Sequence, residues 1–535
     1  MLDPVYEECG IVAAIDLGRD PHTGTVYDEP DDVGKLVPRM LLDIQNRGQL
    51  AAGCSVYNPA DRLRIRTHKG LGSVREVFRL YDAERHRTLM EPLRGTAAIG
   101  HTRYATSGGD DPEYAQPYER RHGRLHKWFS FCFNGNVANH RQLLARLQHD
   151  LGYHQLYPDC DTELFMHYIA FHQRGSQPRD WAGVFRYLCR IVDGAWSIAL
   201  LTAAGDCCVA RDPSGLKPLC WGYRGRHLLV ASESIALQNL GVTTITDVEP
   251  GTMLHIRDGQ VRHHRLRRRA RRSHCFFEWV YFANVASHLD GRSVYQARNR
   301  MGRALGRIES QPITRDHIVV PVPDTSKAAG DGFAYELGIP SIEGLVRNRY
   351  SGDRTFIEGN DRRAKVARKF IALRGILEGK KVFLIDDSLV RSTTITYLAA
   401  YIRDEGKAAE IHVRLACPPI MGPCFYGIDM SSIGELFAPR FLDAPVTRGP
   451  LPAEVLDRMA ADFGVDSINY LPVDAVARCI GLPRSQLCQA CIDLRYPTPA
   501  GRALYAEAVA ARHQGHSGRL TTAGTCGDAL GACKE

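Results

Sequence analysis

The amino-acid sequence predicts two domains of mixed α+β and α/β class, a layered antiparallel structure followed by a doubly wound parallel sheet. The antiparallel prediction rests on short β-type runs joined by turn residues within the first 250 residues, such as GTAAIGHTRY, WFSFCFNGN and HLLVAS. The parallel sheet is predicted because strand-like and helix-like runs then alternate, as in HIVVPV, KAAGDGFAYELG and KVFLIDD. A length of 535 residues fits two or three domains, each large enough to bury a core.

The pattern changes near residues 255–275, and we divide the chain at this point. The expected segments are a cleaved leader (1–8), the antiparallel domain (9–255), a basic linker (256–274), the parallel-sheet domain (275–480), a C-terminal segment (481–499) and a tail (500–535). The tail holds small and turn residues with little periodicity, so we expect it to be mobile.

The composition is that of an ordinary soluble globular protein, with 44% hydrophobic residues, 24% charged residues and a mean hydropathy of −0.26. No apolar stretch approaches the roughly 18 residues that a membrane span requires. The start, MLDPVYEE, is acidic where a signal peptide would be basic and then apolar. We therefore expect a cytoplasmic protein without membrane contact. Its 16 cysteines are then expected to be thiols, metal ligands or nucleophiles, because the cytosol is reducing.

The net charge of +8 comes almost entirely from one arginine-rich stretch. Its members are Arg262, Arg265, Arg267, Arg268, Arg269, Arg271 and Arg272. No aromatic residue that could stack on a base is interleaved with these arginines. A charge run of this kind is typical of a solvated linker, and it gives no reason to expect nucleic-acid binding.

The first candidate site is a cysteine that becomes the N-terminal residue if the leader is removed. Cleavage after Glu8 would give Cys9 a free α-amine, whose ordinary pKa of about 7.7 to 8.0 lets it act as a base near neutrality. The thiol of the same residue could then attack a carboxamide and form a thioester. The developing oxyanion needs preorganised donors, which the side-chain amide of Asn134 and the N–H of Gly135 can supply. We take these three residues as catalytic.

Cys9, GHTRYATSGG, FNGNVANH and CDTELF together resemble the N-terminal-nucleophile glutamine amidotransferase family, and NRGQLAAG and RDPSGLKPL are similar to further family segments. The resemblance implies a hydrolase-type fold of layered antiparallel sheets in which the cysteine releases ammonia from glutamine. It also implies that Arg103 pairs with the carboxylate of glutamine and Asp161 with its α-ammonium. A guanidinium and a carboxylate are physically sensible partners for those two groups.

The second candidate site is the segment KVFLIDDSLVRSTTI, in which an apolar strand ends at Asp386 and Asp387 and a helix begins near Thr394. Backbone N–H groups at a helix start form an anion site, and the hydroxyls of Ser392, Thr393 and Thr394 would assist them. Two adjacent carboxylates can hold ribose hydroxyls or Mg²⁺, which prefers oxygen ligands.

This segment resembles the phosphoribosylpyrophosphate loop of type I phosphoribosyltransferases. Upstream, VVPVPDTSKAAG is similar to the family's pyrophosphate loop, and NRYSGDRTFI resembles the flexible loop that closes over the diphosphate. The resemblance implies that Thr325, Asp386 and Asp387 bind Mg²⁺. The residues that it implies for phosphoribosylpyrophosphate are Asp324, Ser326, Lys327, Arg349, Arg354, Arg391, Ser392, Thr393 and Thr394.

The two halves in this order, from Cys9 to about Pro499, resemble the amidophosphoribosyltransferase family. The resemblance implies transfer of the glutamine amide nitrogen to C1 of phosphoribosylpyrophosphate, the first step of de novo purine synthesis. The products would be 5-phosphoribosylamine, glutamate and pyrophosphate. It further implies feedback inhibition by purine nucleotides and a homo-oligomer of two or four chains.

Three alternative functions were compared with the sequence. One is a paralogous glutamine-dependent phosphoribosyltransferase of another pathway. A glutamine-dependent sugar isomerase should lack the second site, which is present. A phosphoribosylpyrophosphate-sensing regulator should have a DNA-reading module in place of the nucleophile domain.

The chain departs from the family pattern at several positions, none of which removes a catalytic group. Ser392 stands where glycine is usual, and a side chain there disfavours positive φ. The other departures are Asn284, Val285 and Ala286 in place of Arg-Pro-Asp, Lys217 in place of arginine, and Asp353 as an insertion in the closing loop. They bear on substrate affinity and on nucleotide feedback.

The third candidate site is a set of cysteines. Cys488 and Cys491 have the C-x-x-C spacing, which alone is a modest sign of metal or redox chemistry. The family resemblance adds Cys275 and Cys424, and in one branch of the family these four positions bind a [4Fe–4S] cluster, which requires thiolate ligands. Zinc in a Cys₄ site and four buried free thiols are the alternatives. A cluster here would attach residues 481–499 to the rest of the fold.

Overall fold

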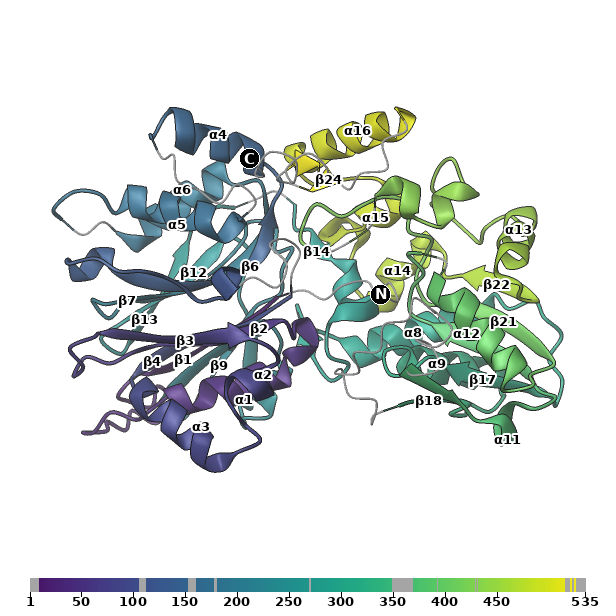
Figure 1. Ribbon diagram of the computed structural model, residues 1–535, viewed down its shortest axis with the longest axis horizontal. Helices are drawn as coiled ribbons and strands as arrows, with labels where there is room; N and C mark the ends of the chain where they lie inside the picture. Colours follow the sequence, from purple (N-terminus) through teal and green to yellow (C-terminus); the bar gives the residue numbers. More distant parts are fainter. Residues whose placement is uncertain are drawn as a thin grey trace, which may run out of the picture.

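The computed structural model describes residues 9–104, 112–152, 160–177, 180–268, 271–348, 369–391, 393–428, 430, 432–514, 520–521 and 524–525. Two folded halves lie side by side along the long axis (Figure 1). The N-terminal half holds two stacked antiparallel sheets, and the C-terminal half holds a parallel sheet. The expected fold class is therefore confirmed.

The N-terminal half is built on a seven-stranded and a six-stranded sheet whose paired strands are all antiparallel. In spatial order the first sheet contains β11 (Ile245–Asp247), β9 (Cys220–Arg224), β10 (His227–Ala231), β1 (Gly10–Asp16), β4 (Ala97–Arg103), β2 (Ala51–Tyr57) and β3 (Ile65–Leu71). The second contains β13 (Gln260–Arg265), β12 (Thr252–Arg257), β8 (Cys207–Arg211), β7 (Gly194–Thr202), β6 (Phe129–Val137) and β5 (Tyr118–Arg120).

Helices cover the outer faces of both sheets, which gives four layers (Figure 1). The first sheet packs against α1 (Val37–Asp43), α2 (Val74–Val77) and α7 (Ile235–Gln238), and the second against α4 (His140–His149), α5 (Asp161–His172) and α6 (Trp181–Ile191). Alternation along β1 explains the layering, because successive side chains of a strand point to opposite faces. Ile11 and Ala13 belong to the core between the sheets, whereas Val12 and Ala14 belong to the core under the helices.

The C-terminal half contains four parallel strands. In spatial order they are β17 (His317–Pro321), β20 (Lys381–Asp386), β21 (Glu410–Leu415) and β22 (Ser467–Tyr470). One face packs against α8 (Val294–Arg307), α9 (Lys327–Leu337) and α14 (Val473–Ile480), and the other against α11 (Arg374–Leu377), α12 (Thr393–Asp404) and α13 (Ala453–Phe463). Phe383 and Leu384 fill opposite faces of the sheet. Coverage of both faces is the expected doubly wound arrangement.

The two halves meet at a junction formed by segments far apart in the sequence. The parallel pair β14 (His274–Cys275) and β23 (Leu487–Cys488) joins the end of the arginine-rich stretch to the C-terminal segment. The start of that stretch is β13, which is the edge strand of the second sheet.

Residues 500–513 do not match the expectation of a mobile tail, because they form α16 (Pro499–His513). The side chain of Thr498 caps the helix by accepting from the N–H of Gly501, and Pro499 is its first residue. Leu504 and Ala508 are buried in the core of the junction, and α16 lies at the top of the view beside α4 of the N-terminal half (Figure 1). Within the described part of the chain, no helix combines the length and the apolar character needed to cross a membrane.

Candidate active sites

The structure brings the predicted nucleophile next to the predicted carboxylate clamp. Cys9 immediately precedes β1, in which Gly10 pairs with Thr102 of β4, so Cys9 lies beside Arg103 on the neighbouring strand. The Cys9 Sγ lies 3.6 Å from the carbonyl oxygen of Tyr104. The Arg103 side chain is buried, with its guanidinium carbon 5.3 Å from the ring centre of Tyr114.

The predicted oxyanion donors end strand β6 in the facing sheet. A Cβ at Gly135 would lie 2.1 Å from a backbone carbonyl of β7, so no larger residue fits there. The Nδ2 of Asn134 is buried and has no hydrogen-bond partner among the described residues. Buried donors without partners are rare in folded proteins, which marks this amide as available to a ligand. His101 Nε2 lies 3.2 Å from the carbonyl of Phe133, so Asn134 and the end of β4 lie near one contact between the sheets.

Replacing Asn134 by alanine is expected to lower kcat for glutamine hydrolysis by about 10²- to 10³-fold, the cost of removing one oxyanion donor. KM for glutamine should change little, because the donor acts on charge that develops during the reaction. The matched control is Asn136→Ala, since the Asn136 amide already donates to the carbonyl of Phe425 at 2.9 Å. Steady-state assays of glutamate release measure both variants. An equal fall in kcat for the two would contradict a special role for Asn134.

Asp161, the predicted partner of the α-ammonium, is the first residue of α5. Its Oδ2 accepts from the backbone N–H of Val137 at 2.8 Å, and its Oδ1 lies 2.5 Å from His140 Nδ1. The contact with Val137 places this carboxylate against the same end of β6 that carries the oxyanion donors. The sequence analysis did not single out His140, which opens α4.

The predicted magnesium ligands meet at the carboxyl ends of β17 and β20, where α/β sheets bind ligands. Thr325 Oγ1 donates to Asp387 Oδ2 at 2.5 Å, and Ser326 Oγ donates to Asp386 Oδ1 at 3.0 Å. Burial raises the pKa of both aspartates, and the neighbouring Asp387 carboxylate raises the pKa of Asp386 further. A cation at this position would offset the like charges, so the oxygen-rich pair fits Mg²⁺.

The remaining predicted phosphate-binding residues surround this pair only in part. Lys327 opens α9 and pairs with Glu343, and Asp324 lies 3.6 Å from a guanidinium nitrogen of Arg347. Arg391 lies 3.5 Å from a carboxylate oxygen of Glu435. Thr393 and Thr394 begin α12, as expected for a helix that follows the acidic pair. The positions outside the described residues are Arg349, Asp353, Arg354 and Ser392.

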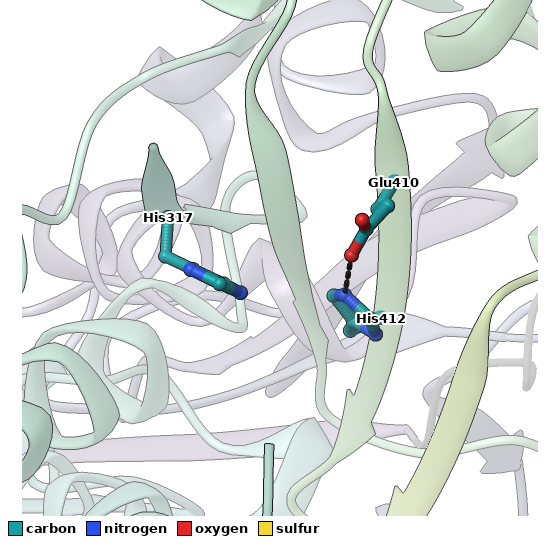
Figure 2. Close-up of side chains that lie close together, drawn as sticks. All are labelled: His317, Glu410 and His412. Carbon is teal, nitrogen blue, oxygen red and sulfur yellow. Dashed lines mark hydrogen bonds and ion pairs between the residues drawn. The ribbon is translucent and has the colours of Figure 1, made fainter. Parts of the chain in front are cut away.

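A second polar cluster lies at the opposite, amino edge of the same sheet. His317 begins β17, and Glu410 and His412 lie at the start of β21, with one ligand atom of each within 4.8 Å of the others (Figure 2). His412 Nε2 lies 3.1 Å from Glu410 Oε2. His317 Nδ1 accepts from the backbone N–H of Thr314, so the neutral ring carries its proton on Nε2 and offers no second lone pair to a metal. We therefore assign this cluster to hydrogen bonding.

The four predicted cluster ligands line one cavity at the domain junction. Cys275 and Cys488 are direct partners in the β14–β23 pair, and Cys424 and Cys491 lie on the same cavity wall. In the described part of the chain, the single group of three or more candidate ligand atoms within 4.8 Å of one another contains none of these cysteines. The cavity wall nevertheless carries four thiols that could act as metal ligands.

Lys217, the departure from arginine, also lines this cavity and is buried. Its Nζ lies 2.8 Å from the position that a Cβ at Gly427 would occupy. Gly427 has φ of +100°, a backbone conformation that favours glycine.

Arg47 is a site residue for which the sequence analysis gave no role. Its Nε donates to the carbonyl of Cys9 at 3.1 Å, and its Nη atoms pair with Glu233 at 3.0 Å and Glu278 at 2.7 Å. All three charged side chains are buried. Glu278 begins the π-helical segment η6 (Glu278–Phe282) at the junction. Arg47 lies within NRGQLAAG, and that segment was the only sequence signal for it.

Behind η6, Arg298 donates to the carbonyls of Trp279 and Ala283 and lies close enough to Asp387 to interact with its charge. The Asn284 departure sits beside this segment, and its backbone N–H donates to Glu233 at 2.7 Å. Because a backbone group makes that contact, the changed side chain leaves it in place. A chain of contacts thus runs from the nucleophile to the acidic pair.

Comparison with known proteins also finds a glutamine amidotransferase domain in the N-terminal half and relatives that match both halves. A family model described as a glutamine amidotransferase domain matches residues 101–239. The amidophosphoribosyltransferases of Methanothermobacter thermautotrophicus and Bacillus subtilis are 37% and 34% identical to the chain. These matches cover 92% and 86% of this chain, and 95% and 90% of the relatives.

Solved structures agree over nearly the whole length. The glutamine phosphoribosylpyrophosphate amidotransferase from B. subtilis, complexed with ADP and GMP, has a TM-score of 0.77 at 31% identity and covers 92% of this chain and 98% of its own. A structure described as the allosteric regulatory enzyme of purine biosynthesis has a TM-score of 0.78 at 32% identity and covers 92% of this chain and 97% of its own.

Fold and sites together define a glutamine-dependent transferase, in which an amidotransferase half is joined to a parallel-sheet half. Identity above 30% over almost the full length of the relatives is decisive. The chain belongs to the amidophosphoribosyltransferase family.

Proposed function

We propose that this enzyme transfers the amide nitrogen of glutamine to C1 of phosphoribosylpyrophosphate, giving 5-phosphoribosylamine, glutamate and pyrophosphate in purine synthesis. The observation that carries the proposal is that one chain holds both sites, with the carbonyl of Cys9 linked through Arg47 to the domain junction. The names of the relatives support the same reaction.

In the glutaminase half, the free α-amine of Cys9 takes the thiol proton after removal of residues 1–8, and the thiolate attacks the glutamine carboxamide. Asn134 Nδ2 and the Gly135 N–H hold the oxyanion. Collapse of this intermediate breaks the C–N bond, and the departing nitrogen takes up the proton and leaves as ammonia. Water then hydrolyses the thioester to glutamate. Arg103 and Asp161 hold the carboxylate and the α-ammonium of the substrate.

In the transferase half, Thr325, Asp386 and Asp387 would hold Mg²⁺, which supplies positive charge to the departing pyrophosphate. Asp324, Ser326, Lys327, Arg349, Arg354, Arg391, Ser392, Thr393 and Thr394 are proposed to bind phosphoribosylpyrophosphate. Ammonia has to reach C1 without entering bulk water, where protonation would remove its nucleophilicity.

Further parts of the proposal concern regulation and assembly. Purine nucleotides are proposed as inhibitors, because the B. subtilis relative was solved with ADP and GMP. We also propose a cytoplasmic homo-oligomer. Two of the expected domain limits change, because residues 256–265 lie in the β12–β13 pair of the second sheet and not in a linker, and because α16 extends the ordered C-terminal segment to residue 513.

The test measures pyrophosphate release with Mg²⁺ and phosphoribosylpyrophosphate, using glutamine or ammonium as the nitrogen donor. Both donors are expected to support release, and glutamate is expected to form only with glutamine. Glutamine hydrolysis without pyrophosphate release from either donor would overturn the proposed transferase reaction.

For the cysteines we propose a [4Fe–4S] cluster held by Cys275, Cys424, Cys488 and Cys491, with a structural role. Thiolates at these positions would bind the irons and join β14, β23 and the segment before α16. In the absence of metal, burial raises the pKa of Cys488 to about 12, so metal charge would be needed to keep this thiolate deprotonated.

Replacing Cys491 by serine is expected to remove the iron from anaerobically purified protein, which should otherwise contain about four irons per chain. Because metal-binding free energy is also folding free energy, the soluble yield and the thermal midpoint should fall with it. Cys207→Ser, in strand β8 and outside the lining of the cavity, is the control for metal content. A colourless wild-type protein with one zinc per chain would replace the cluster by a zinc site, and a metal-free protein of full stability would rule out both.

A further inference from the structure

We infer that His140 is a positioning residue that fixes the Asp161 carboxylate for the α-ammonium of glutamine and thereby sets the preference for an amide that carries an α-amino group. The inference rests on the proposed function, in which Asp161 binds that ammonium. Its structural basis is the contact between the starts of helices α4 and α5.

The contact is short and shielded from water. His140 Nδ1 lies 2.5 Å from Asp161 Oδ1, and the His140 side chain is only 1% exposed. A carboxylate oxygen accepts, so the imidazole N–H is the donor. Hydrogen bonds to an ionised acceptor are among the strong ones in proteins, and burial strengthens them.

A second donor completes the positioning of the carboxylate. The N–H of Val137, three residues before His140, donates to the other oxygen, Oδ2, at 2.8 Å. One donor on each oxygen fixes both the position and the plane of the carboxylate. Each oxygen keeps a further lone pair for a ligand, and the Asp161 side chain remains 13% exposed.

The segment that positions Asp161 also carries the proposed oxyanion donors. The groups that would bind the two ends of glutamine are therefore held by one segment of the chain. Asn134, Gly135 and Val137 all lie in the last four residues of β6, and His140 follows Val137 after two further residues. On the other side, Gln116 Nε2 lies 3.2 Å from both the Phe133 carbonyl and Thr162 Oγ1. The start of α5 is therefore held against β6 on both sides of Asn134. A fixed distance between the oxyanion donors and the α-ammonium partner would present the glutamine amide to Cys9 in a reactive geometry.

His140→Ala should free one oxygen of Asp161 and lower kcat/KM for glutamine by about 10- to 100-fold, the range for loss of a hydrogen bond to a charged group. The loss should appear mainly in KM, because the ammonium is bound equally in the ground state and the transition state. His140→Asn should restore most of it, since the asparagine Nδ2 can occupy the place of the imidazole Nδ1.

The experiment uses the full-length enzyme with phosphoribosylpyrophosphate and Mg²⁺, and it compares two ligands. One is glutamine as substrate, and the other is glutaramate, which lacks the α-amino group, as a competitive inhibitor. In His140→Ala, KM for glutamine should rise while Ki for glutaramate stays within about twofold. The matched control is His149→Ala at the exposed end of the same helix. An equal rise of KM and Ki would show a merely structural effect and overturn the inference.

Asp161→Asn separates this inference from the proposed function. If Asp161→Asn leaves KM for glutamine unchanged, the proposed role of Asp161 itself is wrong. If Asp161→Asn raises KM but His140→Ala does not, the inference about His140 alone is wrong. The expected result is that both variants raise KM and that His140→Ala adds little in the Asp161→Asn background, because both changes remove one interaction.

Discussion

Replacing Cys9 by alanine is expected to abolish the use of glutamine while synthesis from ammonium continues. The variant lacks the sulfur that forms the thioester, and loss of a catalytic nucleophile costs about 10⁴-fold or more in kcat. The proposed transferase site is built from β17, β20 and α12 in the other half of the molecule, so ammonium can still attack C1. Pyrophosphate release with each nitrogen donor measures the two activities separately.

The control for this experiment is Cys54→Ala. Cys54 lies in β2 within the same half, and burial raises the pKa of its thiol to about 12, so it cannot serve as a nucleophile near neutral pH. Glutamine use should survive in this control. Intact mass spectrometry of the active wild type should show Cys9 as the first residue, because the mechanism needs its free α-amine. A fully active protein that retains residues 1–8 would contradict the assignment of Cys9.

The class and order of the two halves could be predicted from the sequence because their patterns are local. The continuous apolar run of β1, which is buried on both faces, and the apolar run of β20 that ends in two aspartates reflect burial of single strands. The predicted anion-binding loops are local in the same sense, because a strand that ends shortly before a helix begins can be recognised in a short window of sequence. The structure confirms the predicted strands and helices in the same order, whereas the anion-binding role of the loops stays a prediction.

Contacts between distant residues could not be predicted in this way. Arg47 and Glu278 are separated by 231 positions, and nothing in either neighbourhood indicates that they pair. His140 gives no signal either, because a single histidine at a helix start is ordinary. The availability of the Asn134 amide is likewise a property of the assembled site, since it depends on which groups the fold leaves without a partner.

The C-terminal helix α16 was missed for a different reason, which is the weakness of its hydrophobic periodicity. Residues 500–513 contain ALYAEAVAARH, in which alanines dominate, and a periodic apolar pattern is weak when the buried side chains are small. Helix propensity and capping indicate the element better than periodicity does, because alanine is the best helix former and Thr498 is a good cap. Packing at the junction then fixes the helix in place through Leu504 and Ala508.

Replacing Asp387 by asparagine is expected to lower pyrophosphate release by about 10²- to 10³-fold with either nitrogen donor, in line with loss of one charge that stabilises a transition state. Asp387 is 6% exposed and accepts from Thr325 at 2.5 Å, so the substitution removes a negative charge at the centre of the proposed magnesium site. Its interaction with the positive charge of Arg298 would be lost as well. Basal glutaminase activity, measured without phosphoribosylpyrophosphate, should stay within about twofold, because Cys9 and its donors lie in the other half.

The matched control for Asp387→Asn is Asp316→Asn. Asp316 lies just before β17 at the opposite edge of the same sheet and is exposed, 3.7 Å from Lys380. This variant should keep both activities. Binding is measured separately by thermal denaturation, since Mg²⁺ with phosphoribosylpyrophosphate should raise the midpoint of the wild type and of Asp316→Asn but not of Asp387→Asn. If Asp387→Asn lost basal glutaminase activity to the same extent as pyrophosphate release, the carboxylate would be supporting the fold as a whole. Selective loss of pyrophosphate release together with the thermal shift is the result that places the metal and the ribose diphosphate at the end of β20.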